Sequence, residues 1–247
     1  MRYEKIIKIL SEYPKDEITK DDLLDLYLRE YKNENNKTFI NLVAMLKGYG
    51  IIADKTKYVY QILDKKSYRM KVDDDLRNIN DLISSKYPEI KHITWTTGII
   101  NDFSQHYAIT NHIIVETEKI AISRVINLLK DNLSNDYTVI SEEMFVKNSE
   151  YFLNDNNILV IVKQLIQKAP LNKNDGVYVP SLEKIMVDLM KDRMYLQYQG
   201  SELNYIFENI VDDYSINLRK LLSYAKLRGV SEDIESTLEK TKILESR

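Results

Sequence analysis

The chain has 247 residues, of which 44% are hydrophobic, so it is long enough to build two ordinary cores without cross-links. It contains no cysteine, which excludes disulfide frameworks, thiolate zinc sites and cysteine nucleophiles. The net charge of -3 argues against a uniformly basic polyanion binder, and the 6 Gly and 4 Pro exclude glycine-rich phosphate loops and flexible linkers.

The distribution of charged and apolar residues adds two expectations. Residues 1–63 hold 11 Lys or Arg against 10 Asp or Glu, whereas the rest of the chain is more acidic, so we expect any DNA-binding surface in the first part. Charges interrupt the first residues too often for a signal peptide, and no segment reaches the apolar length of a membrane span. We therefore expect a soluble, cytoplasmic protein.

Three apolar stripes at the helical spacing i, i+3, i+4, i+7 predict three helices in the first part of the chain. Pro14 closes the first helix, and Thr19 begins the second with Asp22 in its first turn. Gly48 and Gly50 end the third helix. The stripes consist of Tyr3, Ile6, Ile7 and Leu10, of Leu24, Tyr27, Leu28 and Tyr31, and of Phe39, Leu42, Val43 and Leu46.

A hairpin is predicted directly after the third helix. Residues 51–53 and 58–62 are rich in β-branched and aromatic residues, and they surround a polar tip at residues 54–57. Three helices followed by a hairpin are typical of a winged helix-turn-helix. We therefore expect a DNA-binding domain of this kind over residues 1–72.

The third predicted helix would expose a small, polar face. Because successive residues turn about 100° around a helix axis, burial of the third stripe places Lys37, Asn41 and Ala44 on the opposite side. Such a face suits a recognition helix, since its backbone can approach base edges while polar side chains bond to bases and lysines meet phosphates. With the helix flanks and the hairpin tip included, the candidate DNA-binding residues are Lys37, Thr38, Asn41, Ala44, Lys47, Lys55 and Lys57.

A near-neutral module of this shape has a second interpretation, in which it docks to protein or mediates dimerisation. The local charge favours DNA, because residues 32–57 contain five lysines and only two acids, Glu34 and Asp54. The protein-docking alternative stays open.

The remaining sequence predicts a second domain over residues 73–247, after an acidic break at residues 71–75. A short helix over residues 76–84 is expected to connect the two domains. The fold class is therefore α+β, with an N-terminal winged helix-turn-helix followed by a mixed α/β domain that ends in several helices. The predicted strands are residues 92–96, 113–117 and 158–162, a helix runs through residues 122–129, and further helices contain residues 182–189, 203–210, 218–225 and 231–233.

The sequence offers little for metal binding or cofactor chemistry. His92, His106 and His112 lack the paired spacing of metal ligands, and no nucleophile elbow, Walker loop or dinucleotide fingerprint is present. Trp95, Phe103 and His106 would line a pocket or, as is more common for such aromatic residues, belong to the core. We expect no metal and no cofactor.

One group of residues leaves a catalytic alternative open. Glu116 and Glu118 with Lys163 weakly resemble the acid-and-lysine grouping of metal-dependent nucleases, since they lie on or beside predicted strands. Glutamate and lysine at strand edges are more often solvated surface residues. The sequence therefore favours a protein that is not an enzyme.

Several short motifs beyond residue 90 follow one another in an order that resembles a known family. The most specific is Val179-Pro180-Ser181-Leu182-Glu183-Lys184-Ile185-Met186-Val187-Asp188-Leu189. The others are Trp95, Phe103 and His106, then Val115-Glu116-Thr117-Glu118-Lys119, Val162-Lys163, Lys168-Ala169-Pro170-Leu171, Tyr198-Gln199-Gly200-Ser201-Glu202-Leu203 and Leu221-Leu222-Ser223-Tyr224-Ala225-Lys226-Leu227-Arg228-Gly229. Together they resemble the AbiEi-like antitoxins of abortive-infection (type IV) toxin-antitoxin systems, over about residues 90–229.

The resemblance implies an antitoxin that represses its own operon by binding inverted repeats in promoter DNA. It also implies that the protein counteracts a nucleotidyltransferase-like toxin encoded beside it, with direct contact left open, and that the winged helix carries the DNA binding. Repeated half-sites suit self-association on DNA. Two other classes stay open: a metal-dependent nuclease or nucleotidyltransferase-related enzyme, and a protein-binding adaptor.

Overall fold

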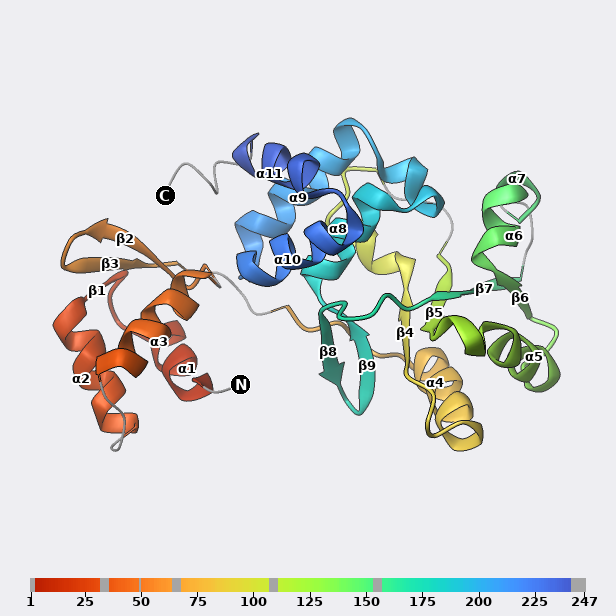
Figure 1. Ribbon diagram of the computed structural model, residues 1–247, viewed down its shortest axis with the longest axis horizontal. Coiled ribbons are helices and arrows are strands. Elements are labelled where there is room, and N and C mark those ends of the chain that lie inside the picture. The colour runs from red at the N-terminus through yellow and green to blue at the C-terminus, as the bar shows by residue number, and fades with distance from the viewer. Residues whose placement is uncertain are drawn as a thin grey trace.

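The computed structural model describes residues 3–31, 36–48, 50–63, 68–106, 111–152 and 157–240 (Figure 1). Its buried apolar side chains form two separate hydrophobic cores. One core lies within residues 3–62, and the other lies within residues 68–238. Among the described residues, no helix combines the length and the apolar character needed to cross a membrane.

The first core is enclosed by three helices and a small sheet. The elements in chain order are α1 (Glu4–Ser11), β1 (Glu17–Thr19), α2 (Lys20–Glu30), α3 (Asn36–Gly48), β2 (Ile52–Thr56) and β3 (Val59–Ile62). The strands are antiparallel and lie in the order β1-β3-β2. The three predicted helices and the hairpin are thus confirmed, and the Thr19 side chain caps α2 by accepting a hydrogen bond of 3.0 Å from the Asp22 backbone N–H.

Two details of this region differ from the prediction. The strand β1 was not predicted, because it has three residues and only Ile18 is buried, which is too short for a periodic pattern. The polar tip expected at residues 54–57 is mostly strand, since β2 continues to Thr56 and the chain reverses at Lys57 and Tyr58. Polar residues there reflect an exposed edge strand rather than a turn. The predicted turn between α2 and α3 falls largely on residues 32–35, which lie outside the described residues.

The second core is enclosed by a four-stranded sheet, a hairpin and several helices. Its strands are β4 (His92–Thr96), β5 (Ile113–Thr117), β6 (Tyr137–Ser141), β7 (Ile158–Gln164), β8 (Leu171–Asn174) and β9 (Val177–Pro180). Its α-helices are α4 (Asp74–Lys86), α5 (Ile122–Asn132), α6 (Glu142–Lys147), α7 (Ser149–Phe152), α8 (Leu182–Lys191), α9 (Ser201–Asp213), α10 (Leu218–Arg228) and α11 (Ser231–Lys240). Three short 3-10 helices are η1 (Thr97–Asp102), η2 (Lys119–Ala121) and η3 (Arg193–Tyr198).

The large sheet has the order β4-β5-β7-β6, in which β5, β7 and β6 are parallel and β4 is antiparallel to β5. α4 and α5 lie on one side of this sheet, and α8 to α11 lie on the other (Figure 1). This arrangement confirms a mixed α+β fold, with the three predicted strands and the four predicted C-terminal helices in place.

The sequence did not predict β6 or the β8-β9 hairpin. The hairpin turns at Asp175 and Gly176, which both have positive φ values, 49° and 91°, and an Asp-Gly pair is a favoured tight turn. The helix predicted over residues 76–84 is α4, but Leu76, Ile79 and Ile83 are buried in the second core, so α4 is part of that core and not a separate connector.

Candidate functional site

The outer face of α3 is the surface that the sequence assigned to DNA. The inner face of α3 is held in the first core by Phe39, Leu42 and Leu46, which are all buried. The Phe39 ring packs on the Tyr27 ring of α2, with centroids 5.7 Å apart. Because this face is fixed inward, the opposite face of α3 points to solvent.

The predicted residues of α3 lie on or beside that exposed face. Asn41 and Ala44 are exposed, as the helical rotation required, while Thr38 and Lys47 are half-buried at its edges. Lys37 lies in the first turn of α3, and its side chain is outside the described residues. α3 contains no Asp or Glu, so it offers no negative charge to a DNA groove.

Two of the predicted cations are already paired with acids. Lys47 Nζ lies 2.5 Å from Asp54 Oδ2, and its ammonium is 5.1 Å from the centroid of the Tyr60 ring. Lys55 on β2 is ion-paired with Glu17 on β1, across the central strand β3. Exposed ion pairs of this kind stabilise a protein by only about 0–1 kcal/mol. A phosphate can therefore replace the carboxylate partner of either lysine with little loss of stability.

The hairpin reversal adds a third cation and an exposed aromatic side chain. Lys57 Nζ lies 5.3 Å from the centroid of the Tyr58 ring, and Tyr58 is mostly exposed. The structure therefore places Lys55 and Lys57 in the β2-β3 hairpin, as predicted.

One exposed residue of α3 was missed by the sequence analysis. Ile40 is 65% exposed, although it lies directly between the buried Phe39 and the exposed Asn41. The signal was available, because Ile40 falls outside the buried stripe and four residues before Ala44, which places both on one face.

A second concentration of charge lies inside the C-terminal region. Glu116 on β5 and Lys163 on β7 are register partners on adjacent parallel strands, as the weak nuclease pattern suggested. Both side chains are buried, whereas Glu118 lies beyond the end of β5 and is exposed. The structure therefore brings together two of the three candidate residues and separates the third.

The acids of this cluster are occupied by cations. Lys184 Nζ on α8 lies 2.6 Å from Glu116 Oε1 and 2.6 Å from Asp188 Oδ2. Lys163 Nζ lies 2.5 Å from Asp192 Oδ2, and Arg228 on α10 is also ion-paired with Asp192. We name these residues, Glu116, Lys163, Lys184, Asp188, Asp192 and Arg228, the buried charge network.

The protonation of the network follows from its pairing. Burial acts to lower the pKa of Lys184, but the carboxylates of Asp188 and Glu116 outweigh it, and the pKa is raised. Burial acts to raise the pKa of Asp188, but Lys184, Lys163 and Arg228 outweigh it, and the pKa is lowered. Lys184 and Asp188 therefore both stay charged at neutral pH. A metal could use these carboxylates only by displacing their lysines, and no group of three His, Asp or Glu among the described residues is placed to hold one.

The segment with the most specific family motif builds this network. Residues 179–189 form the end of β9 and most of α8, and every one of them is buried. Tyr224 on α10 donates a hydrogen bond of 2.9 Å to Asp188 Oδ1, so the network joins α8 to both the sheet and α10. The motif is therefore explained by packing inside the C-terminal region.

The histidines and the aromatic candidates do not form one site. The imidazole of His92 lies 3.2 Å from Asn80 Oδ1, and His112 is buried against the Phe145 ring. His106 is 80% exposed and pairs with Glu202. Trp95 and Phe103 are buried in the second core, which confirms the core interpretation for both.

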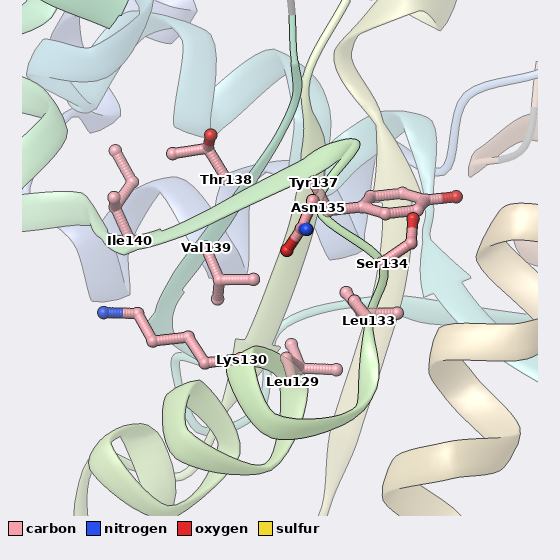
Figure 2. Close-up of a pocket in the computed structure, with 9 residues that line it drawn as sticks. All are labelled: Leu129, Lys130, Leu133, Ser134, Asn135, Tyr137, Thr138, Val139 and Ile140. Atoms are coloured by element: carbon pink, nitrogen blue, oxygen red, sulfur yellow. The ribbon is translucent and has the colours of Figure 1, made fainter.

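A cavity of about 330 Å³ lies between the C-terminal end of α5 and the strand β6 (Figure 2). It is lined by Leu129, Lys130, Leu133, Ser134, Asn135, Tyr137, Thr138, Val139 and Ile140. Lys130 is the sole charged residue among them, and no sequence motif had pointed to this position. β6 is one of the two edge strands of the sheet, so the cavity lies at a sheet edge.

Comparison with known proteins gives one match. No curated protein and no solved structure matches the chain. Residues 38–244 match a family of unknown function, DUF6577. The matched range begins in α3, just after Lys37, and continues through α11, so it covers the rest of α3, the β2-β3 hairpin and the buried charge network. Since this is most of the 247 residues, the chain belongs to the DUF6577 family.

Proposed function

We propose that the protein is a DNA-binding autorepressor and antitoxin, and that its residues 3–63 form a winged helix-turn-helix. In this proposal α3 enters the major groove of promoter DNA and the β2-β3 hairpin is the wing. The element order α1-β1-α2-α3-β2-β3 and the sheet order β1-β3-β2 support it, because they place a hairpin immediately after an exposed third helix.

The observation that carries the DNA-binding half is the outer face of α3. This face presents Asn41 and Ala44 to solvent on a helix without acidic residues. Asparagine can pair with adenine through two hydrogen bonds, and a small residue beside it allows the helix backbone to approach the bases. Lys47 at the end of α3 and Lys55 in the wing would add phosphate contacts, leaving Asp54 and Glu17 for phosphate.

A titration of DNA from upstream of the protein's own gene tests this half. Labelled duplexes that tile this region are titrated with protein, and fluorescence anisotropy reports binding. The variant that combines Lys37→Glu with Asn41→Ala should bind at least about tenfold more weakly, since one lost bidentate base contact costs about 1–3 kcal/mol. Its affinity should also depend less steeply on salt, by about one unit of the log-log slope for each lost phosphate contact.

The matched control is Lys8→Glu, which makes the same charge change on the exposed side of α1. It should retain nearly full affinity, because α1 lies away from the groove in the proposed docking. Equal affinities of the wild-type protein and the α3 variant, or no binding to any upstream duplex, would rule out the DNA-binding half.

The antitoxin half rests on the resemblance of residues 90–229 to AbiEi-like proteins. Because residues 179–189 are buried, the proposal assigns antitoxic contacts to other, exposed parts of the C-terminal region. The partner is a nucleotidyltransferase-like toxin encoded beside this gene. Two copies on inverted repeats would account for operator symmetry.

Co-expression tests the antitoxin half. The adjacent reading frame is induced in a host with and without this protein, and growth is measured. We expect growth arrest when the adjacent reading frame is expressed alone, and recovery of growth when it is expressed together with this protein. Residues 68–247 expressed without the N-terminal region should still restore growth, since that region carries DNA binding in this proposal; failure of the full chain to restore growth would refute the antitoxin half.

A protein-binding adaptor is the second candidate. The pairing of Lys47 with Asp54 and of Lys55 with Glu17 favours it, because both pairs lower the positive charge of the module. The same anisotropy titration separates the two, since an adaptor would bind no upstream duplex.

A further inference from the structure

Ile40 is exposed on α3, beside Asn41 and Ala44 of the proposed DNA-contacting face. The other large apolar residues of α3 are buried or half-buried, but Ile40 is 65% exposed. Single exposed apolar residues are common on protein surfaces, so exposure by itself assigns no role. The chemistry of the residues around Ile40 provides the assignment.

Ile40 lies on a helix that carries no acidic residue. Ala44 lies one helical turn further along the same face, and Asn41 is adjacent. α3 has no acid, in contrast to α2, which has four acids among its 11 residues. In the neighbouring sheet, Asp54 is ion-paired with Lys47 and Glu17 with Lys55. A polyanion can therefore approach this face without meeting a carboxylate of α3.

Major-groove base edges carry one aliphatic group, the C5-methyl of thymine. An A·T pair presents this methyl beside the adenine N6 and N7 atoms that an asparagine can bind. Ile40 and Asn41 are consecutive residues near the N-terminal end of α3, the part of a recognition helix that contacts bases. Both residues thus have a partner on the edge of an A·T pair.

We propose that Ile40 packs on a thymine C5-methyl group in the major groove and makes A·T pairs at that position a determinant of operator specificity. This inference rests on the proposed DNA binding and names the base chemistry that α3 reads. Ala44 lies alongside and permits the close approach.

Replacement of thymine by uracil in the bound duplex tests the proposal, because uracil lacks only the methyl group. The probe is the upstream duplex with the highest affinity, synthesised with uracil at one thymine position at a time. For the wild-type protein, uracil at the contacted position should weaken binding about fourfold, which corresponds to one buried methyl group. Uracil at thymines outside the contacted half-sites should have no effect.

The variant Ile40→Ala tests the same contact by changing the protein in place of the DNA. It should bind the thymine duplex about as weakly as the wild-type protein binds the uracil duplex, and it should not distinguish thymine from uracil. Leu28→Ala is the matched control, because Leu28 is another exposed aliphatic residue, on α2, and this variant should keep the full preference for thymine. Far-ultraviolet circular dichroism checks that each variant is folded.

The outcomes separate this inference from the proposed function. If no upstream duplex binds the wild-type protein, the proposed function fails. If a duplex binds but every uracil substitution leaves the affinity unchanged, or if Ile40→Ala retains the preference for thymine, DNA binding stands and the role of Ile40 is overturned.

Discussion

At the scale of single residues, Lys184 is a buried cation that two carboxylates share. It is buried on α8 and touches two carboxylates, Glu116 and Asp188, at 2.6 Å each. The Trp95 indole N–H also donates to Glu116 Oε1, at 3.0 Å. A buried ion pair costs desolvation energy that its partners must offset, so the loss of one partner leaves an uncompensated charge.

The substitution Lys184→Met tests this balance, because methionine keeps most of the side-chain volume and removes the charge. It should lower the free energy of unfolding by about 3–5 kcal/mol, since Glu116 and Asp188 would remain buried without their shared cation. Urea denaturation followed by circular dichroism measures the change. Lys191→Met is the control, because Lys191 is exposed on the same helix and its loss should cost little. Equal effects of the two substitutions would contradict a structural role for the network.

At the scale of elements, one carboxylate joins the N-terminal end of α9 to the segment after η1. Glu202 accepts hydrogen bonds from the backbone N–H groups of Gln105 and His106, at 2.7 and 3.2 Å. Its other oxygen lies 2.9 Å from His106 Nδ1. The hydrogen bond from the His106 side chain is the main cause that lowers the pKa of Glu202, and burial opposes it. A negative charge in the first turn also suits the dipole of α9.

This contact predicts a pH dependence. Because the pKa of Glu202 is lower in the folded protein, its charge stabilises the fold above the unfolded pKa of about 4.3, and this contribution disappears as the pH falls through the folded pKa. Glu202→Gln should therefore be less stable than the wild-type protein at pH 7. The difference should be smaller at pH 3 than at pH 7, because the contribution of Glu202 is lost as the pH falls from the unfolded pKa through the lower folded pKa.

Urea denaturation at a series of pH values measures this difference. Glu208→Gln, an exposed position on the same helix, is the control and should differ little from the wild-type protein at either pH. A difference between Glu202→Gln and the wild-type protein that persists unchanged at pH 3 would show that the lost contact is not electrostatic.

At the scale of the whole molecule, two hydrophobic cores divide the described residues, yet the family match crosses both. It begins at residue 38, inside α3, and extends to residue 244. α3 and the β2-β3 hairpin therefore belong to the matched region together with the sheet and the C-terminal helices. An autorepressing antitoxin would need both parts of the chain, the N-terminal part for the operator and the C-terminal part for the toxin. DNA binding tests the first part, and recovery of growth tests the second.

Local patterns in the sequence were sufficient for the helices α1 to α5 and α8 to α11 and for the strands β2 to β5 and β7. A helix that packs on a core must repeat apolar residues with its own period, so the stripes of α1, α3, α8 and α9 are visible in the sequence. The same period predicts that Asn41 and Ala44 lie on the exposed face of α3, and the structure confirms it. β1 was too short for a pattern. β6 was missed because its pairing partner is distant in the sequence, and the β8-β9 hairpin was missed because its turn was not recognised.

What the sequence by itself determined is the three helices and the hairpin of the N-terminal region, the exposed face of α3 and the alternation of strands and helices behind it. Only the tertiary structure decided the strand orders and the burial of Glu116, Lys163 and Lys184 in one charge network. The physical reason is range: helical periodicity and capping depend on neighbours within a few residues, whereas the pairing of Glu116 with Lys184 depends on folding contacts between residues 68 positions apart.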